Sequence, residues 1–317
     1  MLGTIDSHRL LASQQNLFYT WVGPTSPPFI TWRDITSNGT NWVMVGTIGS
    51  GTDLYYAISS DLLSWIYGSI ATGLSSVVDA TITCNGSTYI ITYRGGLITT
   101  FYGSSNGTTW SAISVPSGYY TNIASNGSSF VAIDFTNGKA LYSTSGSSWT
   151  AYTLPVLGSM ANWYSISSNG SNYVAIANGI STYSAYSSTG TSWTSSTLPT
   201  SGNWGDITSN GSMYVAVDPG NSGSTATAYS TNSGVSWTAG NMPISAAWDS
   251  ITSNGIDFLA TSVNLPYLSY SIDGINWSIL PLPTNINRIS GKGLSFNNTG
   301  KIFGGVSFNN AAKIITT

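Results

Sequence analysis

The sequence predicts an all-β fold made of one short unit repeated around a ring, and three recurring features carry this prediction. Seven tryptophans recur at intervals of 44, 45, 39, 44, 44 and 40 residues: Trp21, Trp65, Trp110, Trp149, Trp193, Trp237 and Trp277. Six Asn-Gly pairs recur between them, and a proline follows six of the seven tryptophans after six residues. A period of about 40 to 45 residues with four short strands is typical of a β-propeller blade. We therefore expect a seven-bladed β-propeller with four-stranded blades.

Each Asn-Gly pair lies between two alternating apolar runs, as in DITSNGTNWVMV, and this pattern predicts a β-hairpin. The pairs begin at Asn38, Asn85, Asn126, Asn169, Asn210 and Asn254. We expect a type I′ turn at each pair, since both central residues of that turn need positive φ. An aromatic residue follows each Asn after four positions and predicts a packing position on the second strand: Trp42, Tyr89, Phe130, Tyr173, Tyr214 and Phe258.

The third and fourth strands of each unit are joined by a turn that ends in tryptophan. Examples are SSNGTTW, STSGSSW, SSTGTSW and SIDGINW. A short polar side chain in such a turn accepts hydrogen bonds from backbone amides, while the tryptophan anchors the outer strand. The proline six residues later lacks a backbone donor and is expected to end that strand.

The two ends of the chain are expected to share one blade. The last copy has Asn297-Asn298 in place of Asn-Gly and lacks the tryptophan turn, whereas Trp21 and Pro27 precede the first hairpin. We therefore expect an N-terminal extension over 1–14 and a single propeller over 15–317, with the N-terminal strand closing the ring and removing exposed sheet edges. The expected blades span about 32–70, 78–115, 120–154, 163–198, 204–242, 248–282, and 288–317 plus 15–24.

Composition excludes several classes of function. Only 6% of the 317 residues are charged, the net charge is −3, and all eleven acidic residues are aspartates. Nucleic-acid binding needs clustered cations and is not expected. Cys84 and His8 are the single cysteine and histidine, so no disulfide, Cys/His zinc site or histidine triad is expected within the repeats. We predict no metal, no cofactor and, without a long apolar run, no membrane insertion.

The tryptophan turn resembles the Asp-box, or bacterial neuraminidase repeat, of sialidases and many non-enzymatic propellers. The Ser/Asn/Gly-rich, charge-poor composition also resembles propellers of phage tail and adhesin proteins. The sialidase resemblance would imply an arginine triad, a Tyr nucleophile paired with Glu, and an Asp acid/base. This chain has no Glu and no Arg-Ile-Pro motif, so we expect no enzyme. A hydrolase stays as an alternative, favoured only by a pair of carboxylates that face each other across the central pocket.

A second aromatic series lies six residues before the hairpin Asn and supplies the candidate ligand site. It consists of Trp32, Tyr120, Trp163, Trp204 and Trp248, with Asp79 in the second unit. Rings at the start of the inner strands could stack on sugars, with polar neighbours such as Asn122, Ser165 and Asp206. The alternative is that the rings fill the space between blades. Arg33 and Arg288 are candidate anion contacts.

These observations predict a non-catalytic binding module. The expected partner is a cell-surface glycan, recognised by a phage or virus tail-associated or extracellular adhesin through several shallow aromatic sites whose avidity adds up. The alternative is a structural decoration or scaffold protein that docks other virion or fibre subunits. We see no secretory signal and expect a virion or extracellular location.

Overall fold

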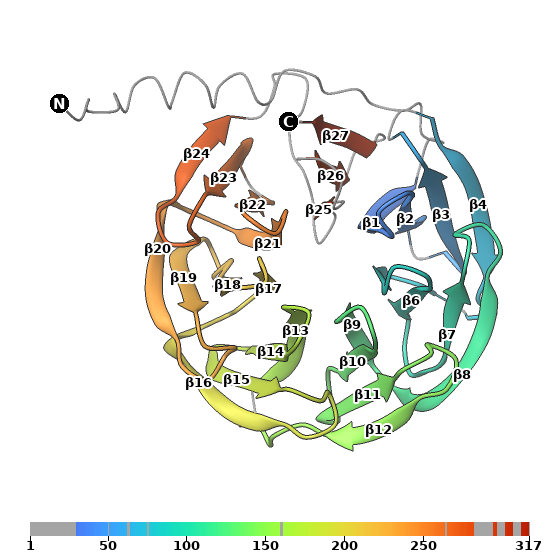
Figure 1. The fold of residues 1–317 in the computed structure, drawn as a ribbon, viewed down its shortest axis with the longest axis horizontal. Coiled ribbons are helices and arrows are strands. Elements are labelled where there is room, and N and C mark those ends of the chain that lie inside the picture. The colour runs from blue at the N-terminus through green and yellow to red at the C-terminus, as the bar shows by residue number, and fades with distance from the viewer. Residues whose placement is uncertain are drawn as a thin grey trace.

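The protein is an all-β propeller. The computed structural model describes residues 30–49, 51–61, 64–74, 76–158, 161–263, 265–281, 294–296, 302–306 and 312–316. Within these residues, six four-stranded antiparallel sheets and one three-stranded sheet surround a common axis. Figure 1 shows β1, β9, β13, β17 and β21 around this axis and β4, β8, β12, β16, β20 and β24 at the rim. No helix in the described part of the chain is long and apolar enough to cross a membrane.

The six four-stranded blades follow one another along the chain, each as a simple up-and-down sheet. The first contains β1 (Thr31–Ser37), β2 (Trp42–Thr47), β3 (Asp53–Ser59) and β4 (Ile66–Ala71). The second contains β5 (Asp79–Cys84), β6 (Tyr89–Arg94), β7 (Ile98–Ser104) and β8 (Ser111–Gly118). The third contains β9 (Tyr120–Ser125), β10 (Phe130–Asp134), β11 (Lys139–Ser143) and β12 (Thr150–Thr153).

The second half of the chain repeats this order. The fourth blade contains β13 (Asn162–Ser168), β14 (Tyr173–Asn178), β15 (Ser181–Ser187) and β16 (Thr194–Gly202). The fifth contains β17 (Asp206–Ser209), β18 (Tyr214–Val217), β19 (Ser224–Ser230) and β20 (Thr238–Ala246). The sixth contains β21 (Trp248–Ser253), β22 (Phe258–Ser262), β23 (Tyr267–Ser271) and β24 (Ser278–Pro281).

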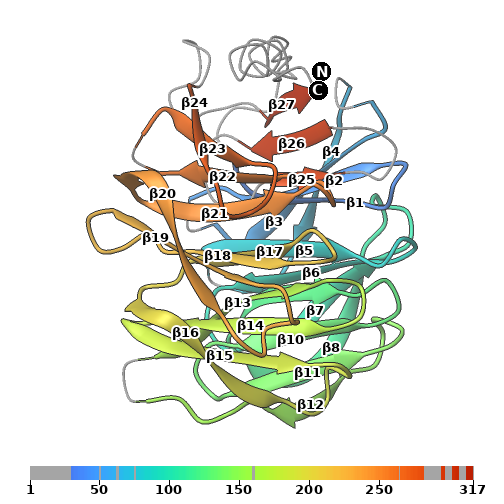
Figure 2. The same cartoon turned by 60° about the vertical axis from the view of Figure 1, so that its left-hand side comes forward.

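The prediction of seven four-stranded blades is wrong. The described residues form six such blades, and the remaining sheet has only β25 (Leu294–Phe296), β26 (Ile302–Val306) and β27 (Ala312–Thr316). This short sheet lies between β21–β24 and β1–β4 (Figures 1 and 2), and it has neither the Asn-Gly hairpin nor the tryptophan turn that shape the other sheets. The N-terminal strand expected over 15–24 lies outside the described residues.

The Asn-Gly hairpins form, but not with the expected type I′ turn. In the first hairpin Ser37 pairs with Trp42, which leaves a loop of four residues between the strands. Gly39 has a φ of 91°, whereas the hairpin asparagines are absent from the described residues with positive φ. The Asn38 side chain replaces the second positive φ, because its Oδ1 accepts the amides of Thr40 and Asn41 at 3.0 and 2.8 Å. The other five hairpins repeat this arrangement.

Five of the six tryptophan turns between Trp65 and Trp277 contain a glycine, and Gly190 shows two physical reasons for it. Gly190 has a φ of 76°, and its amide donates to Ser187 Oγ at 2.8 Å. A Cβ at Gly190 would lie 2.8 Å from Val131 Cγ2 of the preceding blade. Both the left-handed backbone and the contact between blades therefore favour glycine.

The core lies between neighbouring sheets and consists of buried aliphatic and aromatic side chains. The aromatic residues four positions after the hairpin Asn are all buried: Trp42, Tyr89, Phe130, Tyr173, Tyr214 and Phe258. Two tyrosines of this set also join the blades through their hydroxyl groups, since Tyr214 Oη donates to the Asn172 carbonyl at 2.6 Å and Tyr173 Oη donates to the Ser129 carbonyl at 2.9 Å.

The prolines do not end the outer strands as expected. β8, β16 and β20 run through Pro116, Pro199 and Pro243. In β16 the pairing with β15 is interrupted between Thr197 and Gly202, so the proline occupies an irregular stretch where no ladder donor is needed. The outer strand therefore continues into the crossover that leads to the next blade.

Candidate functional site

The inner strands of the blades bring the predicted site residues together around the axis. In β1, Trp32 pairs with Gly46 and Asp34 pairs with Val45, which makes Arg33 the extra residue of a β-bulge. The same bulge occurs in β9, β13 and β21. Because the bulge shifts the strand by one residue, it separates the aromatic side chain before it from the polar side chain after it.

The predicted stacking residues are buried. Trp32, Tyr120, Trp163, Trp204 and Trp248 are each 0 to 1% exposed. Trp204 Nε1 donates to the Thr200 carbonyl at 3.3 Å, and Trp248 Nε1 donates to the Ile244 carbonyl at 3.2 Å. Trp204 and Trp248 therefore hold the end of the preceding outer strand against the start of the next blade. No ring face is open, so the structure does not support sugar stacking at these residues.

The predicted anion contacts are not assembled among the described residues. Arg33 is half-buried, and its Nε donates to Thr47 Oγ1 at 3.3 Å. Arg288 lies outside the described residues. The neighbouring blade contributes Arg94, whose guanidinium lies 3.7 Å from the Asp79 carboxylate, with both side chains more than 40% exposed. An ion pair this exposed contributes little to stability.

An axial cavity of about 230 Å³ lies between the inner strands, and polar side chains from all six four-stranded blades line it. Asn122 Nδ2 donates to Ser165 Oγ at 2.9 Å, and Ser165 Oγ donates to Asp206 Oδ1 at 2.6 Å. Asp206 Oδ2 accepts the Ile251 amide at 3.1 Å, so one chain of hydrogen bonds links four blades. These residues were expected beside a ligand, and the structure shows them joining inner strands.

Two carboxylates line the axial cavity, which is the feature that would favour a hydrolase. Asp34 Oδ1 accepts the Ile35 amide at 2.8 Å, and its Oδ2 accepts the Ile82 amide at 2.9 Å. Both oxygens of Asp206 are likewise occupied by Ser165 and Ile251. Carboxylates that fix backbone amides in this way are positioned for structure rather than for proton transfer. The described residues contain no group of three or more His, Cys, Asp or Glu side chains suited to a metal ion.

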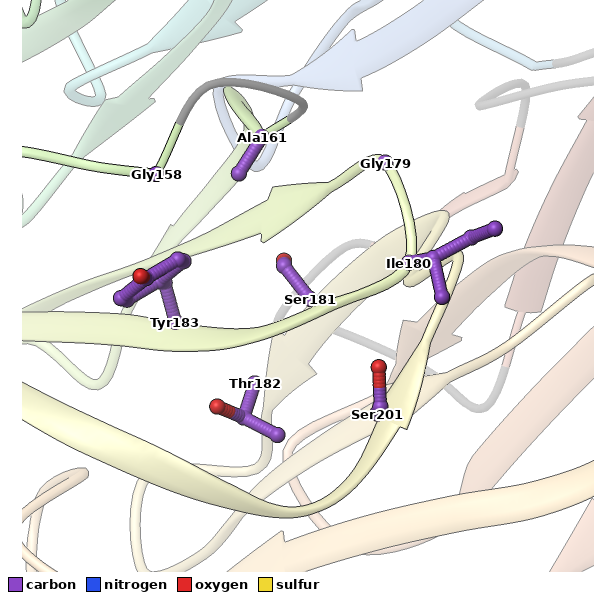
Figure 3. Close-up of a pocket in the computed structure, with 8 residues that line it drawn as sticks. All are labelled: Gly158, Ala161, Gly179, Ile180, Ser181, Thr182, Tyr183 and Ser201. Carbon is purple, nitrogen blue, oxygen red and sulfur yellow. The ribbon is translucent and has the colours of Figure 1, made fainter.

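A second cavity, the crossover pocket, opens at the face where the chain passes from the third blade to the fourth. It encloses about 300 Å³ and is lined by Gly158, Ala161, Gly179, Ile180, Ser181, Thr182, Tyr183 and Ser201 (Figure 3). Gly158 and Ala161 belong to the crossover between β12 and β13, and Tyr183 belongs to β15. None of the eight lining side chains is charged.

The rim of the crossover pocket is formed by a strained turn. Gly179 and Ile180 alone connect β14 to β15, and both have positive φ, at 89° and 56°, as a type I′ turn requires. A β-branched residue in this region is an outlier with a cost of about 1–2 kcal/mol. The turn is held by the Gly179 amide, which donates to Asn203 Oδ1 at 3.0 Å. Ile180 nevertheless leaves its side chain 60% exposed.

The Tyr183 ring lies beside the crossover, and a glycine makes this placement possible. A Cβ at Gly158 would lie 3.0 Å from Tyr183 Oη, which is tighter than ordinary contacts. Tyr183 is 38% exposed, and Val156, two residues before Gly158, is exposed as well. Figure 3 shows Tyr183 and Ile180 at opposite ends of the pocket with Ser181 between them.

Sequence reasoning from the repeat missed the crossover pocket, because the pocket is built where one blade departs from the others. The available signal was Asn178-Gly179, a further Asn-Gly pair at the end of a predicted strand. The prediction used only the six Asn-Gly pairs that recur at the same position in each unit, and Asn178-Gly179 is not one of them.

Comparison with known proteins identifies the fold of the chain but does not assign it to a family. The sequence matches no family model and no curated protein. A catalytically inactive histidine-to-alanine variant of virginiamycin B lyase from Staphylococcus aureus, with quinupristin, matches with a TM-score of 0.74 and 14% identity over 94% of this chain and 98% of that chain. YCF48 bound to D1 peptide matches with a TM-score of 0.65 and 14% identity over 94% and 95% of the two chains. YCF48 from Cyanidioschyzon merolae matches with a TM-score of 0.63 and 13% identity over 93% and 98%.

These matches correct three predictions from the sequence. The resemblance to Asp-box propellers and phage adhesins is overturned, since no family model matches and the similar structures are a lyase and YCF48. Neither the glycan-binding adhesin nor the virion scaffold fits these structures. The prediction that the protein is not an enzyme, which was argued from the absence of Glu and of the Arg-Ile-Pro motif, is overturned as well, because a similar structure is that of an enzyme. His8, the single histidine here, lies outside the described residues.

The location predicted from the sequence, on a virion or outside a cell, stays a prediction. At identities of 13 to 14%, the similarity to the lyase and to YCF48 establishes the architecture alone. The chain is a β-propeller.

Proposed function

We propose that the protein binds a polypeptide segment at the crossover pocket, with an apolar or aromatic side chain of that segment inserted beside Tyr183. The observation that carries this proposal is the pocket itself, an uncharged space of about 300 Å³ that combines an aromatic ring, hydroxyl groups and glycines. A concave, mainly uncharged site with a few polar groups suits one buried side chain and its neighbouring peptide groups.

Two hydroxyl groups of the pocket are free to meet a peptide backbone. Within the described part of the chain, the hydroxyls of Thr182 and Ser201 make no hydrogen bond, although both line the pocket. Gly158 and Gly179 have no side chains, which lets another backbone approach closely. A lining without lysine or arginine disfavours phosphate-bearing ligands, which need cationic partners.

The strain at Ile180 supports the same site. The turn holds an isoleucine in the left-handed region while its apolar side chain faces solvent at the rim. Strained residues of this kind occur where binding requires a preset conformation. An apolar ligand side chain would cover Ile180 and recover part of the cost of its exposure.

The similar structures add support of a general kind. The fold carries a bound peptide in YCF48 and quinupristin in virginiamycin B lyase. Neither structure shares more than 14% identity with this chain, so the proposal depends on the residues of its own pocket.

The proposal is tested by screening the purified protein against an array of short peptides of varied sequence and then measuring affinity for the best binder. Tyr183→Ala removes the ring from the pocket and is expected to weaken binding about tenfold, since a buried aromatic contact contributes about 1.5 kcal/mol. Tyr267→Ala is the matched control, because Tyr267 is 37% exposed on β23 of another blade.

The control defines the outcomes. Retained affinity in Tyr267→Ala with a loss in Tyr183→Ala supports the crossover pocket. Equal losses in both variants, or no peptide bound by the folded wild type, would overturn the proposal.

A further inference from the structure

The chain contains nine Asn-Gly pairs, and this dipeptide has its own covalent chemistry. The pairs begin at Asn38, Asn85, Asn106, Asn126, Asn137, Asn169, Asn178, Asn210 and Asn254. The glycine amide nitrogen can attack the asparagine side-chain carbonyl and expel ammonia, which yields a cyclic imide that water opens to aspartate or isoaspartate. The reaction requires the glycine N–H to lose its proton and leave any acceptor that holds it.

The structure holds the glycine N–H in eight of the nine pairs. A serine hydroxyl accepts it in six pairs, a thiol in one and an amide oxygen in one. The distances for the serine acceptors lie between 2.8 and 3.1 Å. Among the described residues, Gly138 N is the one amide of this set that no side-chain acceptor holds, and it lies at the end of the turn over 135–137.

Asn137 and Gly138 lie in the loop between β10 and β11, with Asn137 exposed. The buried Asp134 carboxylate organises this loop, since its Oδ1 accepts the amides of Thr136 and Asn137 at 2.8 and 3.0 Å. Its Oδ2 accepts Asn137 Nδ2 at 3.0 Å, which fixes the asparagine side chain. The Gly138 carbonyl in turn accepts the Leu154 amide at 2.7 Å, so the loop also holds the start of the crossover.

We propose that Asn137-Gly138 is a site of spontaneous covalent modification, which converts Asn137 to aspartate or isoaspartate faster than the asparagine of any other Asn-Gly pair. A solvent base takes the Gly138 amide proton. The Gly138 nitrogen then forms a bond to Asn137 Cγ, the Cγ–Nδ2 bond breaks, and ammonia leaves with a proton from solvent. One water molecule adds to either carbonyl of the imide and restores an open chain, with no oxidant or cofactor involved.

The product changes the loop because of its charge. In the unmodified protein an amide N–H of Asn137 meets the Asp134 carboxylate at 3.0 Å. After modification a second carboxylate takes the place of this donor, and two like charges at such a distance repel each other. The isoaspartyl product also adds one methylene to the backbone. Both changes loosen the loop that contacts Leu154 at the start of the crossover.

The first test follows the rate of modification at each site by peptide mapping and mass spectrometry of the folded protein in a mildly alkaline buffer. Asn137 is expected to be modified several-fold faster than each of the other eight asparagines. The same measurement in the urea-unfolded chain serves as the control, and there the nine rates should be similar because the hydrogen bonds are gone. A folded-state rate at Asn137 no higher than at the other pairs would overturn the proposal.

The second test separates the charge effect from the chemistry. Asn137→Asp reproduces the aspartyl product and is expected to lower the unfolding temperature, whereas Asn137→Gln keeps the amide and is expected to slow modification at this position strongly, because the longer side chain must close a six-membered imide. Combining Asn137→Asp with Asp134→Asn removes the repulsion and should recover part of the lost stability. If Asn137→Asp were as stable as the wild type, the inferred consequence for the loop would be wrong.

Discussion

At the scale of single residues, Ile180 shows how one residue can be kept in an unfavourable conformation at a site of proposed function. Its φ of 56° places a β-branched side chain in the left-handed region. Asparagine tolerates this region and, unlike glycine, does not raise the conformational entropy of the unfolded chain. Ile180→Asn is therefore expected to raise the free energy of unfolding by about 1 kcal/mol.

The measurement is urea-induced unfolding followed by tryptophan fluorescence. Ile256→Asn is the control, because Ile256 is 62% exposed and is not among the residues with positive φ. A gain of stability in Ile180→Asn alone identifies backbone strain as the cause. A similar change in both variants would attribute the effect to removal of exposed apolar surface instead. Peptide affinity in Ile180→Asn is expected to fall, since the apolar rim is lost.

Asp273 links a single tryptophan turn to acid stability. Partial burial raises the pKa of Asp273, but hydrogen bonds outweigh it and lower the pKa from 3.8 to about 2. The donors are Asn276 Nδ2 at 2.8 Å, the Asn276 and Ile275 amides at 2.7 and 2.9 Å, and Ser271 Oγ at 3.0 Å. A lowered pKa stabilises the fold above pH 3.8, and this stabilisation is lost as the pH falls from 3.8 to about 2.

Asp273→Asn should flatten the dependence of the unfolding temperature on pH in that interval. The expected difference is small, since the side chain is exposed and screened by solvent. Asp53→Asn, which removes another surface carboxylate, controls for the change of net charge. An unchanged slope in Asp273→Asn would show that the turn does not couple to protonation.

At the scale of the elements, the tryptophan turn joins neighbouring blades through its glycine. Gly190→Ala would force an alanine to a φ of 76° and place its Cβ 2.8 Å from Val131 Cγ2. Gly211→Ala has a comparable φ of 93°, but nothing lies within 4 Å of its Cβ. Both variants are therefore expected to lose about 1–2 kcal/mol of stability through backbone strain. Gly190→Ala alone loses a further amount of about 1–3 kcal/mol through overpacking against Val131.

Chemical denaturation of the two variants measures this difference directly. Gly190→Ala is expected to be the less stable variant. Equal losses would show that the backbone alone decides the choice of glycine in these turns and that the neighbouring blade yields without cost.

Elements built from local signals could be predicted from the sequence, whereas radial packing could not. Asn-Gly and Ser-x-x-Gly turns determine where strands reverse, so the hairpins of the six blades were recognisable. Whether the Trp163 ring faces a ligand or a neighbouring blade depends on the bulge between Trp163 and Ser165. A bulge adds one residue without a reliable sequence signal, and it directs the ring into the protein.

The crossover pocket was beyond prediction for a different physical reason. It depends on a contact between Gly158 and Tyr183, 25 positions apart, and on a turn unique to one blade. A sequence repeat indicates only what the blades have in common, so a feature found in one blade is not predicted from it. The error at the last sheet has the opposite cause. A four-stranded blade was predicted there by extending the repeat to a segment that lacks the Asn-Gly hairpin and the tryptophan turn.

At the scale of the whole molecule, the blades are held together by buried tyrosines as well as by aliphatic packing. Burial raises the pKa of Tyr93 and of Tyr173 from 10.0 to about 12. Burial also raises the pKa of Tyr89, Tyr120, Tyr214 and Tyr270 well above 10.0. These residues come from five different blades, so their ionisation acts on the ring as a whole.

The sign of this coupling follows from the direction of the shifts. A raised pKa means that the folded state disfavours the phenolate, so the stabilisation is complete below pH 10.0 and is lost as the pH rises from 10.0 through about 12.

We therefore expect the unfolding temperature to fall steeply above pH 10.0, because several tyrosines ionise only in the unfolded chain. The part of the phenolate absorbance that comes from these six tyrosines should appear together with the loss of the circular-dichroism signal of the sheets. Tyr214→Phe removes one ionisable group while the ring stays buried, and it should shift that transition to higher pH relative to its own stability at neutral pH. A phenolate signal that develops fully before any loss of β structure would show that the tyrosines ionise within the intact propeller, and this outcome would contradict the coupling.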